Sequence, residues 1–331
     1  MNEKTLETSM RLSAAAGTEV RLYSQTAPQK TRWLWEPYIP RGKITIVQGD
    51  PGEGKSTLAL QLAAAVSRGQ AFPERGQDGP PEYVLYQNAE DGIADTLRPR
   101  LDRAEADCSH IMYIRETDEP LGIIDSRFVR LLEYIRPALV VLDPLQAYLG
   151  SEIDMHRANE VRPLMSALAE MAEEYGCAIV LIGHMNKSQQ TKSLYRGLGS
   201  IDLTAAARSV LLVAKDPARP DNRVIFQIKN SLAQTAEPAA FSLRDGNFEW
   251  IGDYEADLSE LLSSEMHTDR PCEKAKKFLR EWLTEDQPKM RQKELLDMAD
   301  SEGIRKRTLM KAKHELRIRS VRDGKVWFWA L

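Results

Sequence analysis

The sequence predicts an α/β fold with a mostly parallel sheet, followed by a small C-terminal domain. Three observations support this prediction. Short, continuous apolar runs alternate with helical stretches, as is typical of strands that are covered on both faces. A glycine-rich loop joins the first of these runs to a helical stretch. After about residue 253 the alternation stops, and three helical stretches and a hairpin follow.

Six strands are expected from the apolar runs, at 44–48, 83–87, 111–114, 138–143, 178–183 and 209–214. Helical stretches at 56–68, 91–106, 126–136 and 157–175 separate several of them. Crossovers of this kind connect parallel strands. Two further strands, 223–229 and 247–251, are expected to be antiparallel. Residues 1–30 show no clear pattern and are expected to form a loose N-terminal arm.

The remaining residues divide into three predicted parts. Residues 31–252 form the α/β domain, and residues 253–271, acidic and rich in serine, form a linker. Residues 272–331 contain helical stretches at 273–283, 293–304 and 305–316, and then a hairpin with Asp323 and Gly324 at its turn. Three helices followed by a hairpin is the outline of a winged-helix domain.

The charge of the chain is unevenly distributed. The whole sequence has a formal net charge of −4, yet residues 272–331 hold 16 Lys and Arg against 10 Asp and Glu. A basic third helix and wing agree with DNA binding. Docking to another protein is equally compatible with this pattern.

The cysteines and the hydropathy exclude several classes of protein. Cys108, Cys177 and Cys272 form no C-x-x-C pair and have no His/Cys cluster around them, so neither a zinc site nor a disulfide framework is expected. No long apolar segment and no signal peptide are evident. We therefore expect a cytoplasmic protein without a membrane partner.

The strongest local motif is G-x-x-x-x-G-K-S, from Gly49 to Ser56, placed between a strand and a helix. Glycines allow the backbone N–H groups to converge on phosphate oxygens, and the helix N-terminus adds its dipole. Lys55 can reach the β- and γ-phosphates, and the Ser56 hydroxyl can ligate Mg²⁺. We expect ATP and Mg²⁺ as ligands. The predicted nucleotide-binding residues are Gly49, Asp50, Pro51, Gly52, Glu53, Gly54, Lys55, Ser56 and Thr57.

Polar residues at three further strand ends complete the predicted site. Asp143 follows five apolar residues and can hold Mg²⁺, although it could instead cap a turn. Glu90 is the candidate for activating water, whereas the neighbouring Asp91 could cap the next helix. His184 can contact the γ-phosphate or be structural. The aromatic segment 31–42 could cover a nucleotide base or pack into the core.

The segments GDPGEGKST, QNAED, VVLDPL, IGHMNKS and RGLGSIDLTAAARSVLLVAKDP together resemble those of RecA-type P-loop ATPases, over roughly residues 32–251. They are similar in particular to the hexameric replicative helicases of plasmids and phages, the RepA-like and DnaB-like group of AAA family ATPases. The resemblance implies a RecA-like core and a ring with ATP between subunits. It implies Glu90 as the catalytic glutamate and Asp143 as the Mg²⁺ acid, and suggests His184 as a sensor.

The resemblance also suggests that Lys229, and Arg208 with it, reach into the neighbouring subunit's site as cationic fingers. For Arg208 a salt bridge is the alternative. The loop 185–199 contains Lys187, Lys192 and Arg196 and no acid, which is compatible with a phosphate backbone. The leading expectation is a replicative helicase that moves on single-stranded DNA. A nucleotide-switched DNA-binding protein or loader, or a recombinase-like filament, is the alternative.

Overall fold

The computed structural model describes residues 3–72, 78–115, 120–150, 153, 157–184, 201–258, 271–284, 288–324 and 326–330. The chain folds as two compact units. One unit contains the chain as far as the strand that ends at His184. The other contains the strands from Ala239 onward and all the C-terminal elements. The strands Ser209–Lys215 and Asn222–Asn230 are divided between the two units.

A nine-stranded sheet forms the centre of the fold, in the order β11-β10-β9-β8-β3-β7-β6-β4-β5. The strands are β3 (Ile44–Gly49), β4 (Val84–Asn88), β5 (Ile111–Met112), β6 (Leu139–Asp143), β7 (Ala178–His184), β8 (Ser209–Lys215), β9 (Asn222–Asn230), β10 (Ala239–Arg244) and β11 (Asn247–Asp253). The strands from β8 to β5 pair in parallel, whereas β10 is antiparallel to both β9 and β11. The predicted, mostly parallel sheet is therefore confirmed.

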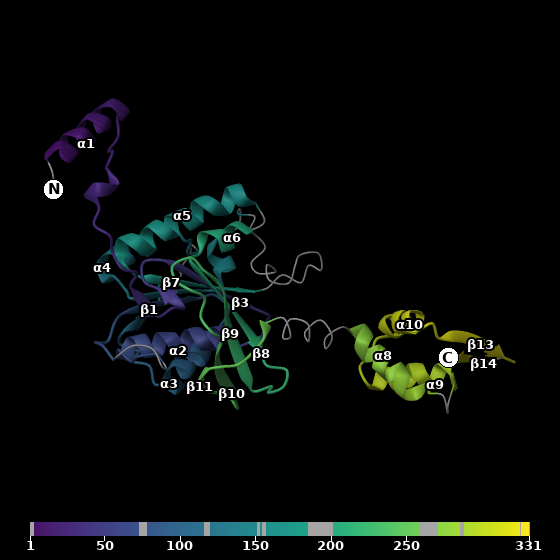
Figure 1. The fold of residues 1–331 in the computed structure, drawn as a ribbon. Coiled ribbons are helices and arrows are strands. Elements are labelled where there is room, and N and C mark those ends of the chain that lie inside the picture. Colours follow the sequence, from purple (N-terminus) through teal and green to yellow (C-terminus); the bar gives the residue numbers. More distant parts are fainter. Residues whose placement is uncertain are drawn as a thin grey trace. The chain divides into compact units, whose positions relative to one another are not determined.

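Helices cover both faces of this sheet (Figure 1). One face carries α2 (Lys55–Arg68) and α3 (Arg98–Arg103), and the other carries α4 (Ser126–Ile135), α5 (Ala158–Tyr175) and α6 (Ile201–Ala206). The expected helix 91–106 is interrupted, because a π-helical turn at Ile93–Leu97 precedes α3. Buried strand residues such as Ile46, Val140 and Leu181 pack against α4 and α5 to form the main core.

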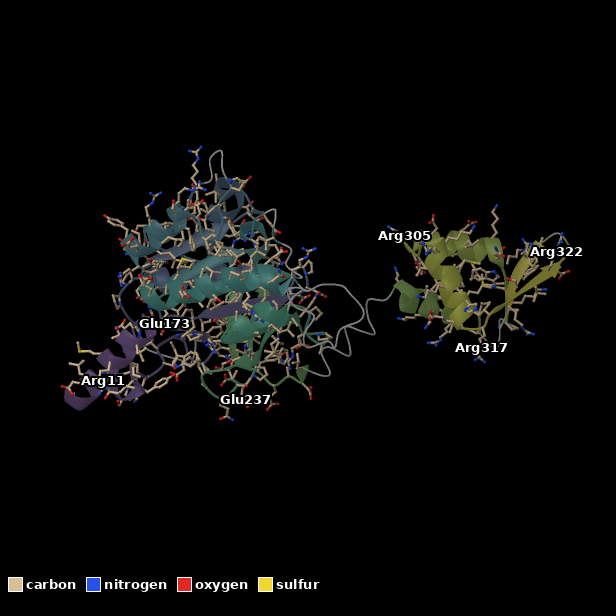
Figure 2. The ribbon with its side chains drawn as sticks, turned by 90° about the horizontal axis from the view of Figure 1, so that it is seen from above. Arg11, Glu173, Glu237, Arg305, Arg317 and Arg322 are labelled. Carbon is tan, nitrogen blue, oxygen red and sulfur yellow. The ribbon has the colours of Figure 1, made fainter. Side chains whose placement is uncertain are left out.

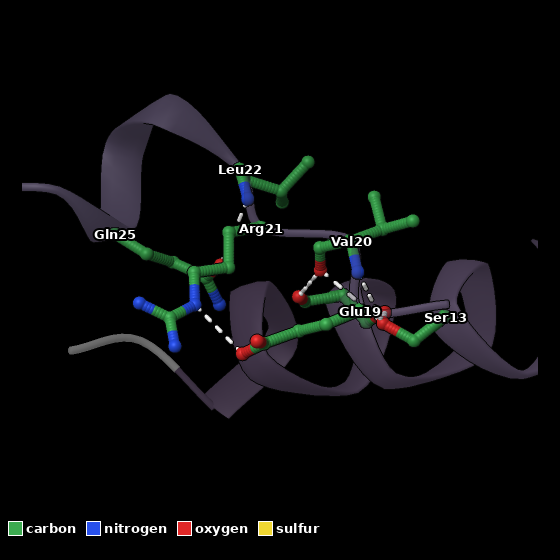
Figure 3. A network of polar contacts seen from close by, with 7 residues as sticks. Ser13, Glu19, Val20, Arg21, Leu22 and Gln25 are labelled. Atoms are coloured by element: carbon green, nitrogen blue, oxygen red, sulfur yellow. Dashed lines mark hydrogen bonds and ion pairs between the residues drawn. The ribbon is translucent and has the colours of Figure 1, made fainter. Parts of the chain in front are cut away.

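The N-terminal arm contains regular structure that the sequence pattern did not predict. Helix α1 (Glu3–Ala16) is followed by a return segment, which it contacts through serine side chains (Figure 3). The Ser13 hydroxyl accepts a hydrogen bond from the Val20 N–H at 2.8 Å, and the Ser9 hydroxyl donates to the Val20 carbonyl. These contacts satisfy backbone groups that a loose arm would leave to water.

The aromatic segment forms a short hairpin of β1 (Trp33–Trp35) and β2 (Ile39–Pro40). Trp35 and Tyr38 are buried, with ring centroids 4.3 Å apart, and Phe72 lies against Trp35. The Gln227 amide donates to the Pro37 carbonyl and thereby holds the hairpin turn to β9. Packing is thus the role that the structure gives to this segment.

The C-terminal elements have their own core. Helices α8 (Pro271–Trp282), α9 (Gln292–Ser301) and α10 (Lys306–Glu315) accompany a three-stranded antiparallel sheet of β12 (Lys289–Arg291), β14 (Val326–Ala330) and β13 (Arg319–Asp323). Phe278, Leu295, Leu309 and Trp329 fill the space between them. The three helices and the hairpin are where the sequence pattern placed them, while β12 was missed. Their assignment as a winged helix stays a prediction.

None of the helices in these described ranges combines the length and the apolar character needed to cross a membrane.

Candidate nucleotide site

The glycine-rich loop connects the end of β3 to the start of α2. Gly52 and Gly54 have φ angles of 83° and 86°, in the left-handed region that favours glycine. Gly54 is the N-cap of α2 and offers no side-chain hydrogen bond to the helix. The first N–H groups of α2 can therefore bind an anion, which the helix dipole also favours. The other predicted loop residues, Asp50, Pro51, Glu53 and Thr57, lie in the loop or in the first turn of α2.

The ammonium group of Lys55 lies inside this loop. Lys55 is only 4% exposed, and its Nζ donates hydrogen bonds to the carbonyl oxygens of Gly49 and Asp50, at 2.9 and 2.8 Å. Burial lowers the pKa of Lys55, while nearby carboxylates, that of Asp143 first among them, act in the opposite direction. The loop thus holds a cation beside the N-terminus of α2.

Asp143 ends β6 and is 2% exposed. Its Oδ2 accepts hydrogen bonds from the Tyr86 hydroxyl at 3.0 Å and from the Asn88 amide at 3.4 Å, and its carboxylate also accepts one from Ser56. Burial raises the pKa of Asp143, and the charge of Glu90 raises it further. The hydrogen bonds from Ser56 and Tyr86 lower it.

Ser56 and Asp143 fit a magnesium ion. A hydroxyl and a carboxylate in contact with each other are oxygen ligands of the kind Mg²⁺ takes beside a nucleotide. The buried carboxylate gains from a nearby cation, because burial disfavours its charged form. When bound, Mg²⁺ would neutralise phosphate charge, and these two residues would hold it.

The two acids that follow β4 interact with different groups. The Asp91 carboxylate pairs with Arg100 at 2.7 Å. Glu90 instead acts electrostatically on both Lys55 and Asp143, raising the pKa of each. Glu90 is therefore near enough to act on both charges of the site, and it remains the proposed hydrolytic residue.

His184 ends β7, in register with Gly49 on the neighbouring β3. The main chain thus reaches the edge of the sheet at which the phosphate loop begins, as a sensor requires. The His184 side chain and the loop that follows it, residues 185–200, lie outside the described residues.

Lys229 and Arg208 lie at the opposite end of the sheet. The Arg208 N–H donates to the carbonyl of Ile44, the first residue of β3, and its carbonyl accepts from Ser231. The Lys229 Nζ donates to the carbonyls of Thr204, Ala205 and Ala207, at 2.8, 3.0 and 2.8 Å. All three of its donors therefore cap the C-terminus of α6. Burial, and then Arg208, lower the pKa of Lys229.

Sequence reasoning missed Tyr86 and Asn88 as members of the site. They are two residues apart on β4, so their side chains lie on the same face of the strand, and both contact Asp143. The signal was present in the motif YQN, where hydrogen-bonding side chains stand two residues apart at a strand end. Recognising it required the pairing of β4 with β6, which the sequence pattern did not specify.

Replacing each acid after β4 in turn should separate their roles. Glu90→Gln should bind nucleotide like the wild type but lose hydrolysis by roughly 10²–10⁴-fold, because it cannot accept a proton. Asp91→Asn is the matched control, since it changes only a partly exposed ion pair, and its rate should stay within about threefold. Phosphate release and binding of a fluorescent ATP analogue measure both. An inactive Asp91→Asn beside a normal Glu90→Gln would show that the wrong acid was chosen.

Asp143→Asn should stabilise the metal-free protein while removing Mg²⁺-dependent hydrolysis. A raised pKa means that the folded chain binds this proton more tightly than the unfolded chain, so stability falls as the pH rises above the ordinary value of 3.8. In EDTA at pH 8 we expect a melting temperature above that of the wild type. The difference should shrink as the pH is lowered toward the ordinary value of 3.8. A lower melting temperature at pH 8 would contradict this account.

Comparison with known proteins identifies a family and several distant relatives. The sequence profile of a family described as an AAA domain matches residues 7–190, more than half of the chain. DNA repair protein RadA of Bacillus subtilis is 26% identical over 212 residues, which are 62% of this chain and 40% of the relative. RadA of Brucella abortus is 27% identical over 233 residues, 70% of this chain and 45% of the relative.

RadA of Halalkalibacterium halodurans is 25% identical over 215 residues, 64% of this chain and 42% of the relative. The chain thus spans less than half the length of these curated relatives. The match and the geometry of the phosphate loop support a RecA-like P-loop ATPase, and the chain belongs to the AAA domain family.

Proposed function

We propose that this protein is an ATP-hydrolysing motor that assembles as a hexameric ring and moves along single-stranded DNA. The observation that carries the proposal is the position of Arg208 and Lys229. The Arg208 N–H bonds to Ile44, the first residue of β3, and the Lys229 ammonium bonds to the carbonyl of Ala207, the residue before Arg208, whereas the phosphate loop follows the last residue of β3. Five residue steps along a strand span about 17 Å, more than an arginine side chain can bridge. A finger in this position would serve the nucleotide of a neighbouring subunit.

Two observations support DNA as the partner in this proposal. Several relatives are named as DNA repair proteins. The loop 185–199 contains Lys187, Lys192 and Arg196 and no acid. Cationic side chains of this kind release counterions when they bind a phosphate backbone. We place the contact with single-stranded DNA in this loop, directly after the proposed sensor His184.

Two biological settings remain as candidates. The resemblance to plasmid and phage helicases favours DNA replication. The similarity to RadA favours a repair or recombination ATPase, or a filament, that need not open a fork. A forked duplex separates them, because only the helicase should displace the paired strand during ATP hydrolysis. A switch or loader would show no stimulation of its ATPase rate by single-stranded DNA.

The C-terminal elements supply a second proposed contact, as a winged helix. Arg305 and Arg317 flank α10, Arg322 lies on β13, and all three extend from the surface (Figure 2). Lys306 and Arg307, in the first turn of α10, are exposed as well. A helix and wing of this charge suit DNA, and other replication proteins are the alternative partner.

Mixing two inactive variants tests the action of Lys229 on a neighbouring subunit. Lys55→Ala lacks the phosphate cation and Lys229→Ala lacks the finger, so each alone should be nearly inactive. At a 1:1 ratio about a quarter of the interfaces in a ring pair an intact loop with an intact finger, and activity should return in proportion. The size of the assembly with an ATP analogue is measured in parallel. No recovery at any ratio, with subunit exchange demonstrated, would contradict the trans role.

Changing Lys187, Lys192 and Arg196 together to alanine should abolish DNA stimulation and leave basal hydrolysis intact. Each phosphate contact that is lost should flatten the salt dependence of single-strand binding by a slope of about 0.7. Deleting residues 272–331 should weaken binding but keep some stimulation. The reverse pattern would move the primary DNA contact to the C-terminal elements.

A further inference from the structure

We propose that Asn88 is a positioning residue for ATP hydrolysis, whose side-chain amide ties the backbone that carries Glu90 to the buried carboxylate of Asp143. The inference rests on the proposed ATPase function and on Glu90 as the hydrolytic acid. None of the motifs in the sequence assigns Asn88 a role of its own.

The register of the sheet brings the two sides of this link together. Asn88 and Asp143 are paired neighbours at the ends of the parallel strands β4 and β6. The Asn88 Oδ1 accepts hydrogen bonds from the N–H groups of Glu90 and Asp91, at 3.0 and 2.7 Å. Its Nδ2 donates to the Oδ2 of Asp143 at 3.4 Å. One amide therefore contacts both carboxylate-bearing segments.

The orientation of this amide is determined by chemistry. Backbone N–H groups can only donate, so the atom that faces them must be the carbonyl oxygen of Asn88. The amide nitrogen is then left facing the carboxylate of Asp143, which can only accept. Asparagine satisfies both neighbours at once, whereas serine or alanine cannot.

The two halves of the link differ in how they are supported. Asp143 keeps hydrogen bonds from Tyr86 and Ser56 if Asn88 is lost. The N–H groups of Glu90 and Asp91 would lose the partner that forms their turn. Removing Asn88 should therefore disturb Glu90 more than Asp143.

The main chain of the turn is held in part without the Asn88 side chain. The Ala89 N–H donates to the Asp143 carbonyl at 3.1 Å, one residue before Glu90. Beyond Ala89, the turn borders a pocket of 320 Å³ that Asn88 and Asp91 line, and the Asp91 carboxylate pairs with Arg100 in a partly exposed ion pair. The Asn88 side chain therefore adds support at the N–H group of Glu90 itself.

ATP hydrolysis depends on the position of the Glu90 carboxylate. The oxygen of a water molecule forms a bond to the γ-phosphorus while the bond to the bridging oxygen of ADP breaks, and the water proton passes to the Glu90 carboxylate. The carboxylate must lie within hydrogen-bond reach of that water. A displacement of about 1 Å can cost on the order of 100-fold in rate.

A double-mutant cycle on basal ATPase, measured without DNA, tests the inference. Asn88→Ala should lower kcat on the order of 10- to 100-fold, with the KM for Mg²⁺-ATP changed less than about threefold. Asn88→Ala combined with Glu90→Gln should be no slower than Glu90→Gln alone, because Asn88 acts through Glu90. Losses that multiply across the two changes would overturn the proposal, as would a wild-type kcat for Asn88→Ala.

Two further variants guard against a merely structural effect. Asn88→Ser restores an acceptor for the turn but not the reach to Asp143, so it should recover part of the kcat lost in Asn88→Ala and stay below the wild type. Full recovery would show that the contact with Asp143 is not needed and would overturn the link. Tyr86→Phe removes a donor to Asp143 and leaves the turn intact. It should raise the Mg²⁺ concentration for half-maximal rate more than it lowers kcat, the reverse of Asn88→Ala. If Asn88→Ser and Asn88→Ala lose kcat equally while both melt like the wild type, the acceptor for the turn does not position Glu90, and the proposal is overturned.

The outcomes separate this inference from the proposed function. A wild-type protein that hydrolyses ATP without any response to DNA would refute the motor and leave the cycle interpretable. A wild-type protein with no ATPase activity would refute both. Normal ATPase with an additive cycle would refute the positioning role of Asn88 alone.

Discussion

The candidate site depends on the register of four parallel strands. β3, β7, β6 and β4 run in the same direction, so their carboxyl ends share one edge of the sheet. Pairing places His184 beside Gly49 and Asn88 beside Asp143. A shift of one residue in any of these pairings would turn the polar side chain to the other face of the sheet. The apolar residues that precede each strand end, buried on both faces, hold this register.

Burying charge at this edge is unfavourable for the empty fold. Lys55 and Asp143 are each at least 95% buried. Burial lowers the pKa of Lys55 and raises that of Asp143, so it favours the neutral form of both side chains. At Lys55 the charge of Asp143 and the carbonyls of Gly49 and Asp50 partly offset this effect. At Asp143 the hydrogen bonds from Tyr86, Asn88 and Ser56 do so. Such a site is arranged for ligands that carry opposite charges, here phosphate oxygens for the lysine and a divalent cation for the aspartate. Part of the protein's stability is thus exchanged for binding.

The sequence was most informative where a local pattern has a local cause. The glycine loop and the continuous apolar runs predicted β3, α2 and the edge that holds Asp143, since glycine conformation and burial act within a few residues. It failed for β10, whose run Ala-Ala-Phe-Ser-Leu has little β-propensity and forms by pairing with β9 and β11. The roles of Tyr86 and Asn88 were hidden because they depend on a strand more than 50 residues away. Helix α1 was missed because its apolar residues, such as Met10, remain exposed and give no core-facing stripe.

The observed contacts of Lys229 are incompatible with the finger role that we propose for it. Its three donors all bond to carbonyls at the C-terminus of α6. Hydrogen bonds to a charged group contribute about 1.5–3 kcal/mol each, so the ammonium does not leave this position without a strong competing anion. In the proposed ring, a neighbour's triphosphate would be that anion, and it would release the end of α6 as it takes the lysine. Helix α6 begins directly after residues 185–200, where we place the DNA contact. The Lys229 side chain would then have two states, one bonded to the end of α6 and one bonded to a neighbour's triphosphate. The tighter binding of nucleotide to the second state would set the populations of the two.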